Sequence, residues 1–108
     1  MEKIELKDKM NLVDIIDSTD SMVILDFYAD WCNPCRALKN TFKEIENEFD
    51  DVVLIPININ DDNDIVVAQY GIRSIPTLIF IKQGEQLHSI SGYRTPDEMR
   101  KIIIEINK

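Results

Sequence analysis

The sequence predicts an α/β protein with a central mixed β-sheet and helices on both of its faces. Two segments, Met22–Tyr28 and Val52–Ile59, are apolar at nearly every position, which is typical of strands buried on both sides. Helical patterns lie between the apolar segments, and this alternation implies parallel crossover connections. A third apolar segment, Thr77–Ile81, is followed at once by a turn and another strand, which adds antiparallel pairing.

Two helices are predicted in the first half of the chain. Met10–Ile16 carries apolar residues at helical intervals and predicts the first helix. The second is an amphipathic helix from Pro34 to about Phe49, with proline in the first turn, where it is tolerated. Its apolar positions, at steps of four, three and four, are Leu38, Phe42, Ile45 and Phe49.

The second half of the chain predicts a short helix, a hairpin and a final helix. Ile65–Tyr70 is the short helix, stopped at Gly71, and Gln83-Gly84 turns the chain into a strand at Gln86–Ser91. Thr95–Glu98 is a capping box with proline at the first helical position. The apolar face of the last helix is Met99, Ile102, Ile103 and Ile106. The resulting element order is βαβαβαββα.

Composition limits the classes of partner. A length of 108 residues predicts a single domain, and the net charge of −8 disfavours nucleic acid and anionic membranes, which need clustered lysine and arginine. Met1–Lys7 lacks the apolar stretch of a signal peptide, and nothing approaches the roughly 18 apolar residues of a membrane span. We therefore expect a cytoplasmic protein.

Trp31-Cys32-Asn33-Pro34-Cys35 places the only two cysteines at a strand-to-helix junction. In the cytosol such a pair is redox-active or metal-bound rather than structural. Two cysteines cannot complete a four-coordinate zinc site within one chain, although a site shared by two chains stays open. The single histidine, His88, falls on the predicted hairpin, and Asp61–Asp64 lacks the glycine and glutamate of a calcium loop, so we expect no metal.

The chemistry of this pair needs a thiolate and a base. Cys32 lies just before a helix, where free N–H groups and the helix dipole favour an anion, so it is the candidate nucleophile. Cys35 lies one turn into the helix, where we expect greater burial, and suits a resolving thiol. Asp26 interrupts an apolar strand, so burial would raise its pKa toward neutrality and fit it for proton transfer. Trp31 is expected to form a partly exposed lip beside the site.

The chain resembles thioredoxins over essentially its whole length. The matching segments are Asp26–Cys35, Tyr70–Thr77, Lys82–Glu85 and Ser91–Tyr93. A lone Cys-x-x-Cys is weak evidence, but the ordered set of segments is specific. The resemblance implies a thioredoxin fold and a single thioredoxin domain over residues 1–108.

The resemblance also implies roles for individual residues. Cys32 would be the attacking nucleophile, Cys35 the resolving thiol and Asp26 the buried acid of the family. Pro76 matches the family's cis-proline, whereas the residues alone favour a trans bond. Trp31, Ile75 and Gly92 match the apolar surface that receives substrate, and Pro34 stiffens the active-site turn.

The resemblance implies that the reaction is reduction of protein disulfides. The implied processes are electron transport and cell redox homeostasis. No bound cofactor is implied, because the redox group is the Cys32–Cys35 disulfide and electrons would come from NADPH through a thioredoxin reductase. The implied partners are that reductase and disulfide-containing proteins, and nothing in the sequence argues against a monomer.

Three positions depart from the family pattern. Asn33 replaces the usual glycine between the cysteines, where the residue tunes the reduction potential, and Tyr28 stands where many members have tryptophan. Pro56 falls where a lysine is common near the buried aspartate. We expect loss of that cation to raise the pKa of Asp26 further and to slow release of mixed disulfides at neutral pH. Since proline donates no ladder hydrogen bond, Pro56 must lie at a bulge or an unpaired position.

Two other functions are compatible with the same scaffold. A disulfide oxidase or isomerase is disfavoured, because such relatives typically carry a histidine between the cysteines and here the pair is Asn33-Pro34. A binding module or partner subunit that uses only the apolar surface is the alternative from a different class.

Overall fold

The computed structural model describes residues 1–6, 11–61 and 63–108, and it has the predicted element order. Lys7, Met10 and Asp62, which belong to segments interpreted from the sequence, lie outside the described residues. The strands are β1 (Glu2–Lys3), β2 (Met22–Tyr28), β3 (Val52–Asn58), β4 (Thr77–Lys82) and β5 (Glu85–Ser91), and the helices are α1 (Asn11–Ser18), α2 (Asn33–Ile45), α3 (Asp64–Gln69) and α4 (Pro96–Ile106). The first strand, for which the sequence indicated no residue range, is only two residues long.

The strands form a mixed sheet in the order β1-β3-β2-β4-β5. Strand β2 is central, parallel to β3 and antiparallel to β4. The β4–β5 pair is antiparallel, with a register irregularity between Phe80 and Ile81, and its turn uses positive φ angles at Gln83 and Gly84. The mixed sheet confirms the predicted fold class.

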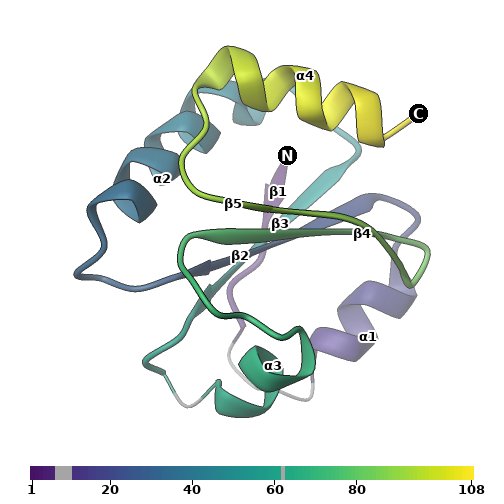
Figure 1. Cartoon of the computed structure of the whole chain (residues 1–108). Helices are drawn as coiled ribbons and strands as arrows, with labels where there is room; N and C mark the ends of the chain where they lie inside the picture. The colour runs from purple at the N-terminus through teal and green to yellow at the C-terminus, as the bar shows by residue number, and fades with distance from the viewer. Residues whose placement is uncertain (7–10, 62) are drawn as a thin grey trace.

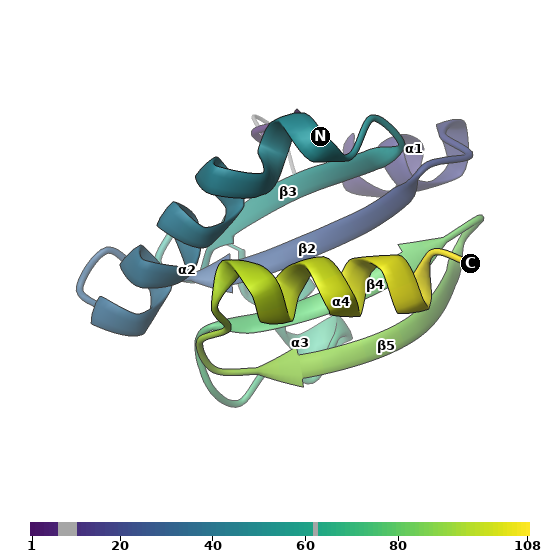
Figure 2. The same ribbon diagram turned by 90° about the horizontal axis from the view of Figure 1, so that it is seen from above.

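Helices cover both faces of the sheet, with α2 and α4 on one face and α1 and α3 on the other (Figures 1 and 2). Because strand side chains alternate, β2 supplies both cores. The core beneath α1 and α3 includes Leu12, Ile16, Val23, Leu25, Phe27, Val53, Ile55, Ile57, Val66, Ile79 and Ile81. The core beneath α2 and α4 includes Met22, Ile24, Leu38, Phe42, Ile45, Val52, Leu54, Leu78, Phe80, Met99 and Ile103.

The helix ends that the structure describes lie within two residues of the predicted ones except at the end of α2. The α-helix stops at Ile45, a 3₁₀ turn spans Glu46–Glu48, and Phe49 is extended, so the helix is shorter than predicted. The two glutamates place negative charge where the helix dipole is already negative, which disfavours continuation. The capping box is present: Thr95 Oγ1 accepts from the Glu98 N–H at 3.2 Å, and the Thr95 N–H donates to Glu98 Oε1 at 2.9 Å.

Pro56 lies within β3 at an unpaired backbone position, one of the two arrangements predicted. Its register with Asp26 is continuous, so there is no bulge between β2 and β3. The Ile4 N–H donates to the Leu54 carbonyl, whereas the Ile59 N–H donates to the Tyr28 carbonyl of β2. Since backbone groups alternate in direction along a strand, the Pro56 nitrogen faces the β1 side, beyond the last β1 bond, and the β2 ladder is intact.

Among the described residues, no helix combines the length and the apolar character needed to cross a membrane.

Candidate active site

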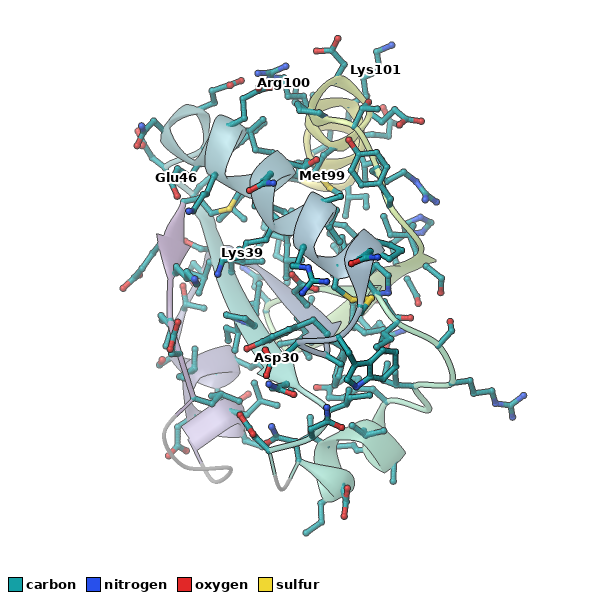
Figure 3. The ribbon with its side chains drawn as sticks, turned by 90° about the vertical axis from the view of Figure 1, so that its left-hand side faces the viewer. Asp30, Lys39, Glu46, Met99, Arg100 and Lys101 are labelled. Atoms are coloured by element: carbon teal, nitrogen blue, oxygen red, sulfur yellow. A yellow bond between two sulfur atoms is a disulfide. The ribbon has the colours of Figure 1, made fainter. Side chains whose placement is uncertain are left out.

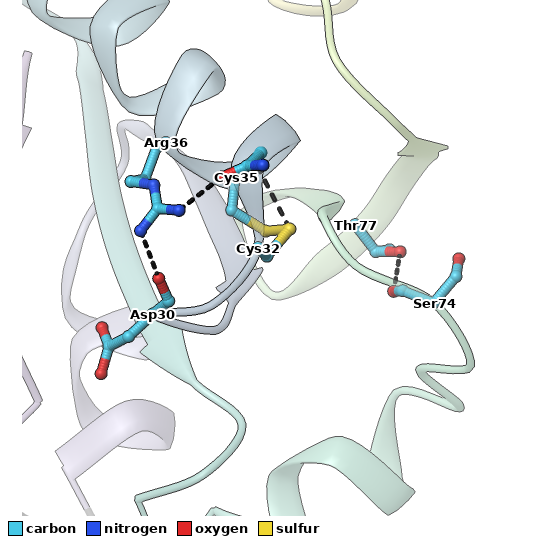
Figure 4. The surroundings of a disulfide bond; sticks show 7 residues. Asp30, Cys32, Cys35, Arg36, Ser74 and Thr77 are labelled. Carbon is cyan, nitrogen blue, oxygen red and sulfur yellow. Dashed lines mark hydrogen bonds between the residues drawn. A yellow bond between two sulfur atoms is a disulfide. The ribbon is translucent and has the colours of Figure 1, made fainter.

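The two cysteines lie where β2 leads into α2, and they form a disulfide (Figure 4). Cys32 is the N-cap of α2, with extended backbone angles, and its Sγ accepts a hydrogen bond from the Cys35 N–H at 3.2 Å. Pro34 lies in the first turn of the helix, as predicted. In the reduced protein the same N–H and the positive end of the helix dipole would favour a Cys32 thiolate.

Exposure does not distinguish the two cysteines in the disulfide form. Each is 5% exposed, whereas the sequence led us to expect that Cys35 would be the more buried. The bond holds both sulfurs in one small apolar cluster with Ala29, against Ile75 and Tyr28, so burial of one sulfur entails burial of the other. Their other neighbours differ, because Cys35 lines a cavity that does not include Cys32.

Asp26 is buried, as predicted, on the face of the sheet covered by α2 and α4. It is 7% exposed, and within the described residues its Oδ1 has no hydrogen-bond partner. Burial raises the pKa of Asp26 from its ordinary value of 3.8 to about 7, and the Lys3 ammonium acts in the opposite direction. Lys3 on β1 is thus a cation that acts on this carboxyl although Pro56 carries no charge. The expected further rise in the pKa of Asp26 from the loss of a lysine at position 56 stays a prediction.

A cavity of about 410 Å³ connects Asp26 with Cys35. Its walls come from β1, β2, β3 and α2 together with the residues that follow α2. They are lined by Met1, Lys3, Glu5, Asp26, Tyr28, Ala29, Asp30, Cys35, Arg36, Lys39, Phe42, Lys43, Glu46, Leu54 and Pro56. Several of these side chains are exposed, so the cavity also joins the buried carboxyl to solvent.

The Ile75–Pro76 peptide bond is cis, as the family resemblance implied and the residues alone did not. Gly92, at the end of β5, donates its N–H to the Pro76 carbonyl at 2.9 Å and has a φ of +89°, which favours glycine. Thr77 Oγ1 donates to the Ser74 carbonyl at 2.7 Å and further orders this loop (Figure 4). The structure thus brings Ile75, Pro76 and Gly92 together, with Ile75 against the cysteines.

Two exposed aromatic side chains adjoin residues of the site in the sequence. Trp31, directly before Cys32, is 68% exposed, in agreement with the expected lip, and Tyr93, directly after Gly92, is 43% exposed. Tyr93 belonged to the matching segment at Ser91–Tyr93 but was not singled out as a site residue. Large aromatic side chains with this exposure provide apolar contact area to a partner.

Arg36 holds the active-site turn, and the sequence did not single it out. Its guanidinium donates to the side-chain oxygen of Asn33 and, at 2.8 Å, to the Asp30 carbonyl (Figure 4). The sequence could have indicated the contact between Arg36 and Asn33, because the two residues are three apart at the start of a helix and side chains at that spacing lie close together. Asn33, where the family usually has glycine, is therefore a hydrogen-bonding part of the turn.

The His, Cys, Asp and Glu side chains considered as metal ligands do not form a metal site in the described residues. In residues 1–6, 11–61 and 63–108 no group of three or more His, Cys, Asp or Glu side chains is placed to hold a metal ion. His88 is exposed on β5 and its ring packs toward Phe80.

Comparison with known families assigns residues 3–105 to the family described as Thioredoxin. The chain belongs to the thioredoxin family. Thioredoxin-T of Drosophila melanogaster is 37% identical over 90 residues, covering 82% of this chain and 56% of that protein. A thioredoxin of Chlamydia caviae is 37% identical over 82 residues, covering 76% of this chain and 79% of its own.

Solved structures agree with this assignment. A mutant thioredoxin from Halobacterium salinarum superposes with a TM-score of 0.86 at 29% identity, covering 99% of this chain and 92% of that one. The family and the disulfide-forming pair together make this chain a thiol-disulfide oxidoreductase, which acts on disulfide substrates.

Proposed function

We propose that this protein reduces protein disulfides, with Cys32 as nucleophile, Cys35 as resolving thiol and Asp26 as the group that accepts the Cys35 proton. The observation that carries the proposal is the cavity that contains Asp26 and Cys35 but not Cys32. It supports different roles for two cysteines that are equally buried in the disulfide.

The reaction proceeds by two exchanges of sulfur. The Cys32 thiolate attacks one sulfur of the substrate disulfide, a mixed disulfide forms, and the other substrate sulfur leaves as a thiolate. The Cys35 thiolate then attacks Cys32 Sγ, which forms the Cys32–Cys35 bond and releases the second substrate sulfur. Two electrons pass from the dithiol to the substrate, and the two cysteine protons complete the two substrate thiols.

Asp26 supports the second exchange. A carboxyl with a pKa of about 7 is partly ionised at neutral pH and can exchange a proton with a thiol in the same cavity. The Cys35 proton would pass to Asp26, directly or through water in the cavity, and from there to solvent.

The aromatic rim supports a protein substrate. Trp31 is exposed directly before Cys32, Ile75 packs against the cysteines, and the Gly92 N–H is bonded to the Pro76 carbonyl beside Ile75. We take these residues, with the exposed Tyr93 that follows Gly92, as the border of the disulfide. Extended substrate backbone would lie against this border, and Asn33 and Pro34 would tune and stiffen the turn.

The cellular setting follows the family pattern. Residues 1–108 would act in the cytoplasm as one monomeric thioredoxin domain without a bound cofactor. The disulfide would be regenerated to the dithiol by electrons from NADPH through a thioredoxin reductase, which makes the chain a carrier in electron transport and cell redox homeostasis.

The equilibrium reduction potential of the Cys32–Cys35 pair against glutathione tests the direction of the reaction. We expect about −270 mV, the value known for thioredoxin itself, whereas a value between about −180 and −120 mV would indicate an isomerase or oxidase. A Cys32→Ser variant should lose reduction of a disulfide substrate such as insulin. If its insulin reduction were retained, the protein would be acting through something other than this pair.

A further inference from the structure

The side chain of Lys3 points to the face of the sheet that carries Asp26. In the parallel pair of β1 and β3, Lys3 is in register with Leu54, which belongs to the core beneath α2 and α4. Pro56 lies two residues further along β3, so it shares that face, and it is in register with Asp26 of β2. Lys3, Pro56 and Asp26 therefore follow one another across three neighbouring strands.

Pro56 leaves the space between the other two residues open. Its ring is compact, and the cavity of about 410 Å³ is lined by Lys3 and Asp26 as well as by Pro56 and Leu54. A long side chain at position 56 would project from the same point of β3 into this space. Because the proline ring does not fill this space, the charge of Lys3 on β1 can act on the carboxyl of Asp26 on β2.

We propose that Lys3 is a positioning residue for the Asp26 proton: its ammonium, across the cavity, stabilises the carboxylate and so sets the pH at which Cys35 is deprotonated. The second half of this statement rests on the proposed function. The ionised form of this carboxyl is the one that such a cation stabilises, because the group is buried and its Oδ1 has no hydrogen-bond partner within the described residues.

Other titratable groups line the same cavity. Glu5 follows β1, Tyr28 is on β2 and Asp30 follows it, Arg36, Lys39 and Lys43 come from α2, and Glu46 follows α2. The Met1 amino group donates to the Glu46 carbonyl, and β3 and β4 contribute no charged residue in register with Asp26. Arg36 is engaged by the Asp30 carbonyl and Asn33. Of these groups, Lys3 is the one whose charge opposes the effect of burial on the pKa of Asp26.

The Lys3 charge is also partly engaged, which limits the size of the effect. Its Nζ lies 3.6 Å from Glu5 Oε1, and its side chain is 45% exposed. Solvent and Glu5 therefore weaken its action on Asp26, so the effect is smaller than that of a direct ion pair.

The decisive measurement is the titration of the Asp26 carboxyl by ¹³C NMR in the oxidised protein, where neither cysteine titrates. In Lys3→Met, which removes the charge and keeps much of the length, we expect the midpoint to rise by about 0.5 pH unit or more. Lys3→Arg should leave the midpoint close to that of the unchanged protein. An unchanged midpoint in Lys3→Met overturns the proposal.

Two further variants separate a local from a general effect. Lys101→Met changes the net charge equally, but Lys101 lies on α4, away from the cavity residues Asp30, Lys39 and Glu46 (Figure 3). It should not move the midpoint, and a rise equal to that of Lys3→Met would contradict a local role. Adding Pro56→Lys to Lys3→Met returns a cation to the same face and should lower the midpoint again.

Kinetics then test the link to Cys35. With a midpoint near pH 7, a rise of about 0.5 unit lowers the ionised fraction of Asp26 at pH 7 about twofold. Release of a preformed mixed disulfide by Cys35 should slow by the same factor in Lys3→Met. If the carboxyl midpoint moves and release does not, the Cys35 half of the proposal and the proposed role of Asp26 both fail, whereas Lys3–Asp26 coupling stands.

Discussion

The two faces of β2 differ in what they bury. Toward α1 and α3 the strand presents Val23, Leu25 and Phe27, each at most 1% exposed, in a wholly apolar core. Toward α2 and α4 it presents Met22 and Ile24 and then Asp26, which faces a cavity. Neighbouring residues of β2 therefore have different roles. Those on the apolar face stabilise the fold, whereas Asp26 on the other face lowers stability when it is ionised and can transfer a proton.

Replacement of Asp26 by asparagine should give the largest change. The pKa of Asp26 is 3.8 when unfolded and about 7 when folded, so the folded state holds the proton more tightly and stability from this group falls as pH rises from about 4 to 7. At pH 8 Asp26→Asn should therefore raise the free energy of unfolding by up to about 4 kcal/mol, with little change at pH 4. Urea unfolding of the oxidised variants at both pH values measures this; an equal change at both would contradict a buried ionised carboxyl.

Truncation of Leu25, the neighbour on the apolar face, should act in the opposite direction. Leu25 is fully buried, so Leu25→Ala should lower the free energy of unfolding by about 3 kcal/mol through lost burial and a cavity. The loss should be equal at pH 4 and pH 8, and the titration of Asp26 should not change. A marked pH dependence of the loss would show that the two faces are not independent.

Removal of the α4 cap tests whether packing over the second face matters to the carboxyl. Thr95→Ala loses the capping bond to the Glu98 N–H and should cost about 1 kcal/mol of unfolding free energy. Because α4 lines no part of the cavity, the Asp26 midpoint should stay the same. Calorimetric melting together with the carboxyl titration provides both readings.

Introduction of lysine at position 56 should give the smallest change. With Lys3 in place, Pro56→Lys adds a second cation and should lower the Asp26 midpoint by about 0.5 pH unit. Release of a mixed disulfide at pH 7 would then accelerate about 1.5-fold. The pH profile of the release rate is the measurement; if neither the rate nor its profile moved, the expected influence of Pro56 on release would be wrong.

Sequence reasoning was successful where the pattern is local. The continuous apolar run of β2 identified a buried strand, and a lone carboxyl within it identified Asp26. The cis bond before Pro76 followed only from the family resemblance, because X–Pro bonds are mostly trans.

The remaining features depend on which strands become neighbours. Lys3 meets the cavity only because β1 pairs with β3 in one particular register, and no periodicity in residues 1–6 reports that. The end of α2 at Ile45 was missed for another reason: apolar spacing continues to Phe49, but the charges of Glu46 and Glu48 oppose the helix.

The central position of β2 in the sheet determines when the active site is disrupted during unfolding. Its amides are bonded between β3 and β4, so they should be among the slowest to exchange with solvent deuterium and should exchange only when the whole molecule opens. The disulfide lies a few residues beyond the end of that strand. The reactive group is therefore attached to the last part of the molecule to unfold, and we expect inactivation on heating to coincide with global unfolding.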